Sequence, residues 1–227
     1  MDSPSAGTKQ KTWQDSLYEQ AARNKPAVLF LTNLLYVLLL AVIVITGYSI
    51  SSDQEIYNYY ALKRAWFGRA ALLVILVVIT PGILGRFNIQ IKISRVITLY
   101  RRRLGILVFM LAFTHAHLIS LPKLAGIEPF VIPPPLFQSF GLSALLILSI
   151  MFLTSNNFSV RRLGKWWKYV HRLVYIALLL ILLHTSLQRV SIWSILAVVF
   201  FVLEIISLVF AYIKGGSFNN PELKKTS

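Results

Sequence analysis

Long apolar stretches separated by shorter polar connections make up most of this chain of 227 residues. Five or six of these stretches hold about 18 or more apolar residues, which is the length that a helix needs to cross a membrane. We therefore predict an all-α integral membrane bundle with six spanning helices. The predicted spans are residues 27–50, 65–84, 104–121, 136–154, 169–187 and 191–212.

We expect the polar segments to be loops between the spans, with a polar segment at each end of the chain. The N-terminal arm covers residues 1–26, with a short interfacial helix expected around Trp13–Arg23, and a polar tail covers residues 214–227. The domain between them, residues 27–213, holds all six predicted spans. Three successive prolines exclude helix from the third loop. The predicted loops are residues 51–64, with Asp53 and Glu55, and residues 85–103, 122–135 and 155–168.

Positive charge is distributed unevenly between the two sides of the predicted membrane. Of the 23 Lys and Arg residues, 18 fall in the arm, the second and fourth connections with Arg172, and the tail. Because cytoplasmic segments carry the excess of Lys and Arg, both termini are predicted to be cytoplasmic, which also requires an even number of spans. The five cations on the other side are Lys63, Arg64, Arg69, Lys123 and Arg189.

Composition supports a membrane protein and excludes several classes of chemistry. Hydrophobic residues make up 56% of the chain, and the mean hydropathy is +0.67, whereas a soluble domain is about 45–50% apolar. The chain has no cysteine, which excludes disulfides, iron–sulfur clusters and thioether-linked haem. The net charge of +15 is explained by topology and anionic lipid rather than by a nucleic-acid partner. No cleavable signal peptide is predicted.

Four histidines are the candidate functional residues, and all four lie in apolar stretches. They are His115, His117, His171 and His184. A titratable ring inside a membrane span is unfavourable and usually functional. Since neutral imidazole is a common metal ligand, two spans that each bring histidines suggest a haem held non-covalently between the third and fifth helices.

Depth along the helices distinguishes the four histidines. His115 follows Arg103, at the inner end of the third span, by twelve residues, or about 18 Å, and His184 lies about 20 Å deeper than His171. His115 and His184 therefore share a depth towards the outer leaflet, and we predict them as the axial pair of a low-spin b-type haem. On a straight helix His171 and His184 point about 140° apart, so the helix would have to bend for both side chains to face the same space between the third and fifth helices. His117 is interpreted as an interfacial or capping residue.

Two segments resemble the signatures of ferric reductase-like transmembrane domains. LGKWWKYVHRLVY, from Leu163 to Tyr175, with His184 after it, is similar to the fifth-helix signature, and RRRLGILVFMLAFTH, from Arg101 to His115, is similar to the third-helix signature. Thr80-Pro81 and Thr154-Ser155 match the ends of the second and fourth helices, so the resemblance covers roughly residues 30–212. Within that family the chain is most similar to the haem-binding membrane subunit of the bacterial periplasmic methionine-sulfoxide reductase system.

The resemblance implies roles for specific positions. His115 and His184 match the ligands of the outer haem, and His171 matches a ligand of the inner haem in two-haem relatives. In those relatives a second histidine binds the inner haem, and the position that matches it here is Arg101. A guanidinium cannot replace imidazole as a ligand. One haem b is therefore expected, with His171 as a conditional second metal site or a contact for FMN or quinone. Arg102 and Arg172 belong to an inner basic rim that either sets topology or binds a flavin phosphate, a haem propionate or an acidic donor.

We predict a multi-pass protein of the cell inner membrane that transfers electrons as a subunit of an oxidoreductase system. A quinol or a flavin reductase on the cytoplasmic side would be the donor, and a periplasmic molybdenum enzyme, the methionine-sulfoxide reductase, would be the acceptor. The chain shows no Gly-rich dinucleotide fingerprint after a strand, so it is not expected to oxidise NADPH unaided. Two alternatives remain: a ferric-iron reductase that uses Asp53, Glu55 and Glu128 to bind iron, and a structural haem-bearing subunit of a larger complex.

Overall fold

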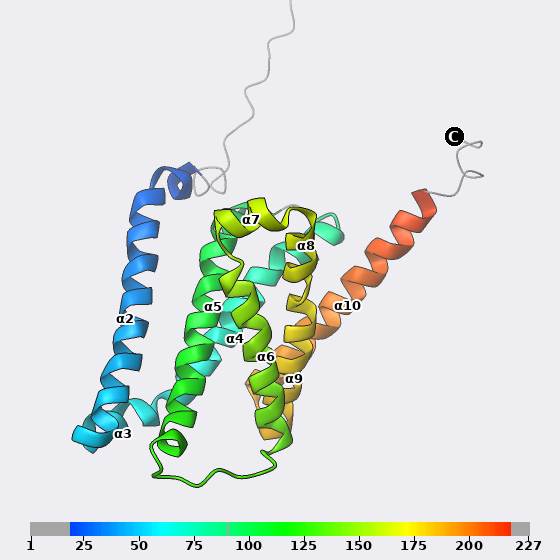
Figure 1. Ribbon diagram of the computed structural model, residues 1–227. Helices are drawn as coiled ribbons and strands as arrows, with labels where there is room; N and C mark the ends of the chain where they lie inside the picture. Colours follow the sequence, from blue (N-terminus) through cyan, green and yellow to red (C-terminus); the bar gives the residue numbers. More distant parts are fainter. Residues whose placement is uncertain (1–18, 90, 219–227) are drawn as a thin grey trace, which may run out of the picture.

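The computed structural model describes residues 19–89 and 91–218, and the regular structure there is entirely helical (Figure 1). This confirms the all-α prediction. The helices are α2 (Lys25–Ser52), α3 (Gln54–Leu62), α4 (Arg64–Arg86), α5 (Lys92–Leu124), α6 (Leu136–Leu153), α7 (Asn157–Leu163), α8 (Lys165–Arg172), α9 (Val174–Gln188) and α10 (Ile192–Phe218).

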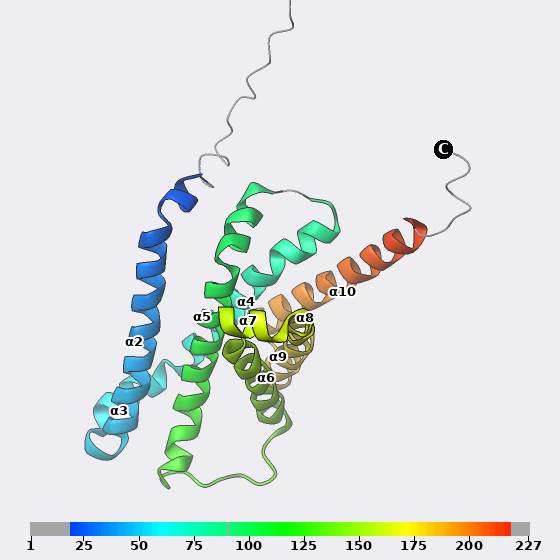
Figure 2. The ribbon, with the colours of Figure 1, turned by 45° about the horizontal axis from the view of Figure 1, so that its top comes forward.

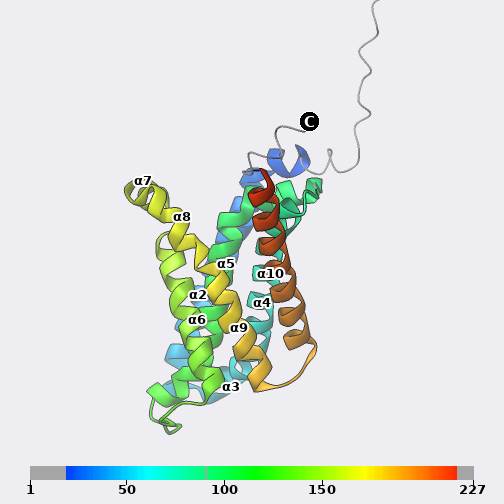
Figure 3. The same cartoon turned by 90° about the vertical axis from the view of Figure 1, so that its right-hand side faces the viewer.

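Six stretches of the described chain are long and apolar enough to cross a membrane, as predicted. They consist of α2, α3 with α4, α5, α6, α8 with α9, and α10 up to Lys214. α2 begins and α10 ends on the same side of the bundle, where α7 and α8 also lie, while α3 and the loop of residues 125–135 lie on the opposite side (Figures 1 and 3). We call the first side the inner side and the second the outer side; that the inner side is cytoplasmic stays a prediction.

The segment predicted as the first loop is mostly helical, so that prediction was wrong. α3 occupies most of residues 51–64. Its N-cap is Asp53, whose carboxylate accepts hydrogen bonds from the backbone N–H groups of Glu55 (3.1 Å) and Ile56 (3.3 Å). A side-chain acceptor at this position satisfies N–H groups that have no partner inside the helix. Hydropathy did not reveal α3 because this short helix is not uniformly apolar.

The two basic connections and the start of the tail are also more helical than predicted. α5 already begins at Lys92, and residues 157–172 form α7 and α8, separated by Gly164 with φ +52°. α10 continues to Phe218, so the tail predicted from residue 214 starts inside a helix. Lys and Arg are good helix formers, and an apolar pattern detects only the part of a helix that lies in lipid. Residues 19–23 of the predicted interfacial helix are helical, and the remainder of it lies outside the described residues.

Five helices pack into a closed ring. Each of the neighbouring pairs α5–α4, α4–α10, α10–α9, α9–α6 and α6–α5 is in contact. α2 stands beside this ring, in contact with α5 and α3 (Figure 2), and most of its surface is exposed apolar side chain, as expected for a helix that faces lipid.

α4 supplies much of the interior of the ring. Its buried residues Leu72, Ile75, Leu76, Ile79 and Ile83 recur at the three- and four-residue spacing that places side chains on one helix face. They pack with buried apolar side chains of α5, α6, α9 and α10 in the largest hydrophobic cluster. The ring thereby places α5 and α9, which carry the predicted histidine pair, on either side of a common interior.

Candidate functional site

The structure brings the imidazole rings of His115 on α5 and His184 on α9 together. Their ring centroids lie 6.3 Å apart, and the ring planes make an angle of 73°. The two helices do not pack tightly on each other: α5 packs against α2, α3, α4 and α6, and α9 packs against α6, α8 and α10. The two imidazole groups therefore meet inside the helix bundle, and each is only partly exposed.

Each ring is held through its Nδ1 atom by a backbone carbonyl of a neighbouring helix. His115 Nδ1 lies 2.8 Å from the carbonyl oxygen of Arg64, and His184 Nδ1 lies 2.7 Å from that of Phe137. A carbonyl oxygen can only accept a hydrogen bond, so Nδ1 carries the proton in each neutral ring and Nε2 keeps its lone pair. Within the described part of the chain neither Nε2 atom has a hydrogen-bond partner. Metal-binding histidines are commonly oriented in this way.

The distance between the rings fits one metal ion held between them. Metal–imidazole bonds are about 2.0–2.1 Å long, so two such bonds plus the two nitrogen-to-centroid distances add up to about 6 Å. The observed 6.3 Å agrees with that sum. The described residues contain no group of three or more His, Cys, Asp and Glu side chains suited to a metal ion. A metal held by His115 and His184 would therefore need further ligands from outside this set of side chains, and a haem would bring its own.

His171 lies at the other end of the bundle from this pair. His184 contacts Phe137 at the start of α6, whereas His171 Nε2 lies 3.5 Å from the hydroxyl of Ser155, just beyond the end of α6, a helix about 27 Å long. The His171 ring stacks on Trp167, with 3.9 Å between centroids, and its Nδ1 lies 3.1 Å from the Trp167 carbonyl oxygen. The helix is interrupted at Leu173, between α8 and α9, so the angle of about 140° calculated for a straight helix does not apply to His171 and His184.

The predicted basic rim gathers around His171. Arg102 donates hydrogen bonds to the carbonyl oxygen of Ser155 (2.6 Å) and to the side chain of Asn157 (2.7 Å). Arg172 places its guanidinium 5.2 Å from the ring centroid of Tyr169. Arg101, exposed on α5, is close enough to act electrostatically on His171. These cations have contacts within the protein, and their assignment to a cofactor stays a prediction.

His117 differs from the other three histidines because its Nε2 has a partner on another helix. The Nε2 atom lies 3.1 Å from the hydroxyl of Thr46 on α2, and that hydroxyl donates to the carbonyl oxygen of Val42 at 2.7 Å. The Thr46 oxygen is therefore the acceptor, and His117 Nε2 carries the proton. This contact ties α2 to α5, so His117 joins two helices from within α5 and does not cap a helix end.

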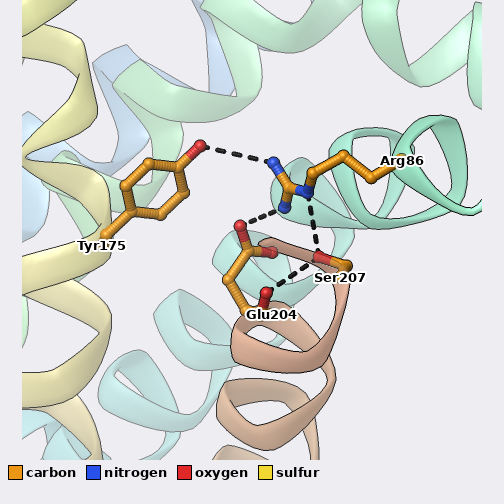
Figure 4. A network of polar contacts seen from close by, with 4 residues as sticks. All are labelled: Arg86, Tyr175, Glu204 and Ser207. Carbon is orange, nitrogen blue, oxygen red and sulfur yellow. Dashed lines mark hydrogen bonds and ion pairs between the residues drawn. The ribbon is translucent and has the colours of Figure 1, made fainter. Parts of the chain in front are cut away.

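A buried polar network on the inner half of the bundle was missed from the sequence (Figure 4). Arg86, at the end of α4, forms an ion pair with Glu204 on α10 and donates to Ser207 Oγ at 2.9 Å and to the Tyr175 hydroxyl on α9 at 3.4 Å. Glu204 lies within the sixth predicted span, whereas Arg86 lies in the second predicted connection, among the cations whose distribution predicts the topology. A buried carboxylate requires a partner, and that requirement was the available signal.

Comparisons with known proteins connect the bundle to one family. Residues 67–182, from α4 into α9, match the family described as Ferric reductase like transmembrane component. This stretch includes His115 and His171 and ends two residues before His184. No solved structure matches the chain.

Curated relatives match part of the chain. The protein-methionine-sulfoxide reductase heme-binding subunit MsrQ of Agrobacterium fabrum is 37% identical over 97 residues, which is 41% of this chain and 45% of that protein. The protein of the same name from Brucella anthropi is 39% identical over 83 residues, which is 35% of this chain and 37% of that protein. The chain thus spans less than half the length of these curated relatives.

Proposed function

Because the chain belongs to the ferric reductase-like transmembrane family, and is therefore a multi-pass membrane protein, we propose that it carries electrons across the membrane on a b-type haem. His115 and His184 would hold the haem, and the electrons would pass from a donor on the inner side to an acceptor on the outer side. Two relatives are named as heme-binding subunits of a protein-methionine-sulfoxide reductase, which supports such an enzyme as the acceptor. The bacterial inner membrane is the corresponding location.

The observation that carries this proposal is the geometry of the histidine pair. The two imidazole rings come from different helices and lie 6.3 Å apart, each with Nδ1 within hydrogen-bond distance of a carbonyl oxygen and with no hydrogen-bond partner at Nε2 among the described residues. Bound haem would supply one-electron chemistry at its iron, and bis-imidazole ligation is typical of electron-transfer centres. The chain's own contribution would be to orient both rings through their Nδ1 contacts, and ligand orientation is one of the means by which a protein sets the potential.

The inner side has the features expected for the donor. His171, stacked on Trp167 and flanked by Arg101 and Arg102, combines a flat aromatic surface with positive charge. The phosphate of a flavin and the carboxylates of an acidic reductase are recognised by such groups, and a quinol would use the same surface from the lipid. We assign Arg102 and Arg172 to this donor side. His171 has Nδ1 beside a carbonyl and only a 3.5 Å contact at Nε2, so it is also the candidate for a second metal site.

Among the alternative acceptors, ferric iron has the weaker support. The outer carboxylates that would bind it are Asp53, Glu55 and Glu128, and Asp53 is already the hydrogen-bond acceptor at the start of α3. Capping leaves this carboxylate less able to coordinate a metal ion. A protein acceptor needs no such ligands on this chain, so we favour it. A purely structural haem subunit would show normal electron flux after the histidines are replaced.

Absorption spectroscopy of the purified full-length chain tests the haem. We expect one haem per chain, with a Soret band that shifts on reduction, and loss of that band in His115→Ala and in His184→Ala. His117→Ala is the matched control and should keep the band, because its ring is bonded to Thr46. His171→Ala separates one haem from two: an unchanged haem content supports one. A wild-type chain without the band, or a band that survives in His115→Ala, would overturn the assignment.

Reoxidation of the reduced chain tests the acceptor. The dithionite-reduced protein in vesicles is mixed with a purified periplasmic methionine-sulfoxide reductase and methionine sulfoxide, or with ferric citrate. We expect turnover-dependent reoxidation with the enzyme and slow reoxidation with the chelate. Faster reoxidation by ferric citrate would instead establish the iron-reductase alternative.

A further inference from the structure

The two histidines of the pair rest on the same local structure in two different helices. His115 Nδ1 contacts the carbonyl oxygen of Arg64, which lies four residues before Gly68, and His184 Nδ1 contacts that of Phe137, which lies four residues before Gly141. In an α-helix the carbonyl of residue i−4 accepts the N–H of residue i. Each carbonyl therefore serves both the glycine N–H and an imidazole from the neighbouring helix.

The glycines are required because the rings occupy the space of a side chain. A Cβ atom at position 68 would lie 3.1 Å from His115 Nδ1, and one at position 141 would lie 2.7 Å from His184 Nδ1. Cγ and Cε1 of each ring are also within 3.3 Å of that point, so the ring lies against the bare backbone. A methyl group there would push the ring away from the carbonyl, and at Gly141 the overlap is too large to be absorbed without movement.

We propose that Gly68 and Gly141 are positioning residues that select the Nδ1–H tautomer of His115 and His184 and aim both Nε2 atoms at one shared metal. The metal part rests on the function proposed above, whereas the tautomer part does not. A carbonyl exposed by a missing side chain accepts the Nδ1 proton and leaves Nε2 as the only lone pair. It also makes Nε2 a stronger donor to a metal. His117 does not lie against a glycine in this way, and its Nε2 donates to Thr46. We therefore expect the Nε2–H tautomer at His117.

A simpler role for the glycines would be close packing of helices, which small residues allow in membranes. α4 packs on α5 and α6 packs on α9, so both roles predict some loss of stability on substitution. The packing role and the positioning role differ in what they predict for the proton on the imidazole. A packing role would disturb both helix pairs without changing a tautomer, whereas the positioning role predicts that each substitution changes the proton position on one named ring.

Nitrogen NMR of the haem-free, [15N]histidine-labelled chain in nanodiscs tests the tautomers without any cofactor. We expect the Nδ1–H form at His115 and His184 and the Nε2–H form at His117 in the wild type. Gly141→Ala should shift His184 alone towards the Nε2–H form, and Gly68→Ala should shift His115 alone. An Nε2–H tautomer at either member of the wild-type pair would overturn the proposal, and this measurement requires no variant to fold.

Haem titration of the same proteins tests the consequence for binding. Loss of an outer contact to a metal-ligating histidine typically weakens metal affinity about 10–100-fold, so we expect haem affinity to fall by that factor in Gly141→Ala and by less in Gly68→Ala, with an altered midpoint potential. Gly47→Ala in α2 and Gly105→Ala in α5 are controls, because a Cβ at either position meets no atom within 4 Å. Equal losses in the controls would refute the positioning role. A wild type that binds no haem but shows the expected tautomers would refute the proposed function alone.

Discussion

Replacing Arg86 with methionine tests whether the buried polar network holds α10 on the bundle. The guanidinium reaches Glu204 and Ser207 on α10 and the hydroxyl of Tyr175 on α9 (Figure 4). Methionine keeps most of the aliphatic length but removes the charge and all three polar contacts. The main consequence falls on Glu204, whose side chain is 3% exposed and whose Oε2 has no hydrogen-bond partner in the described structure.

The expected loss follows from leaving that carboxyl group alone. Removing one partner of a buried ion pair lowers stability by about 3–5 kcal/mol, because the remaining group must carry an unpaired charge or take up a proton. We expect a loss of that size for Arg86→Met. Glu204→Gln should cost less, because the Arg86 side chain that remains is 20% exposed at the end of α4 and can reach water. The double variant Arg86→Met/Glu204→Met should recover most of the loss, since apolar replacement of both partners is often neutral.

A double-mutant cycle on the free energy of unfolding measures these differences. Steric trapping in bicelles gives that free energy for a membrane protein without heating it. Arg95→Met, an exposed position on α5, is the matched control and should change stability by no more than about 0.5 kcal/mol. If Arg86→Met lies within about 1 kcal/mol of the wild type, or if the double variant is no more stable than Arg86→Met, the network does not stabilise the bundle as argued.

Three further predictions concern the ends of helices and the topology. Asp53→Ala should lower the free energy of unfolding by about 1 kcal/mol through loss of the α3 cap, while Asp53→Asn should keep most of it; equal losses in the same assay would exclude capping. Gly164→Ala should cost about 1–3 kcal/mol, because φ at this junction is +52°, and hydrogen exchange should rise selectively in α7 and α8. A fluorescent protein fused after residue 227 should fluoresce and an alkaline phosphatase there should be inactive; active phosphatase would reverse the predicted topology.

The number of spans could be predicted from hydropathy alone because a membrane allows few solutions. A backbone in lipid must satisfy its own hydrogen bonds, so each crossing requires one long apolar helix and leaves an unbroken signal in the sequence. The rise per residue also converts position in a spanning helix into depth. That depth, together with the motif match, led to the prediction of His115 and His184 rather than His117. Helices outside the lipid left no such signal, which explains why α3 and α7 were expected to be loops.

Contacts between distant segments were decided only by the tertiary structure. Arg86 and Glu204 are 118 residues apart, and nothing near either residue identifies its partner. The carbonyls that orient the histidine pair belong to Arg64 and Phe137, 51 and 47 residues from the rings that they bind. A hydropathy pattern places side chains along and around one helix, but it contains no information on which backbone atoms a neighbouring helix exposes. The sequence by itself therefore determined the spans and the depth predicted for each histidine, and packing determined which backbone carbonyl each imidazole contacts.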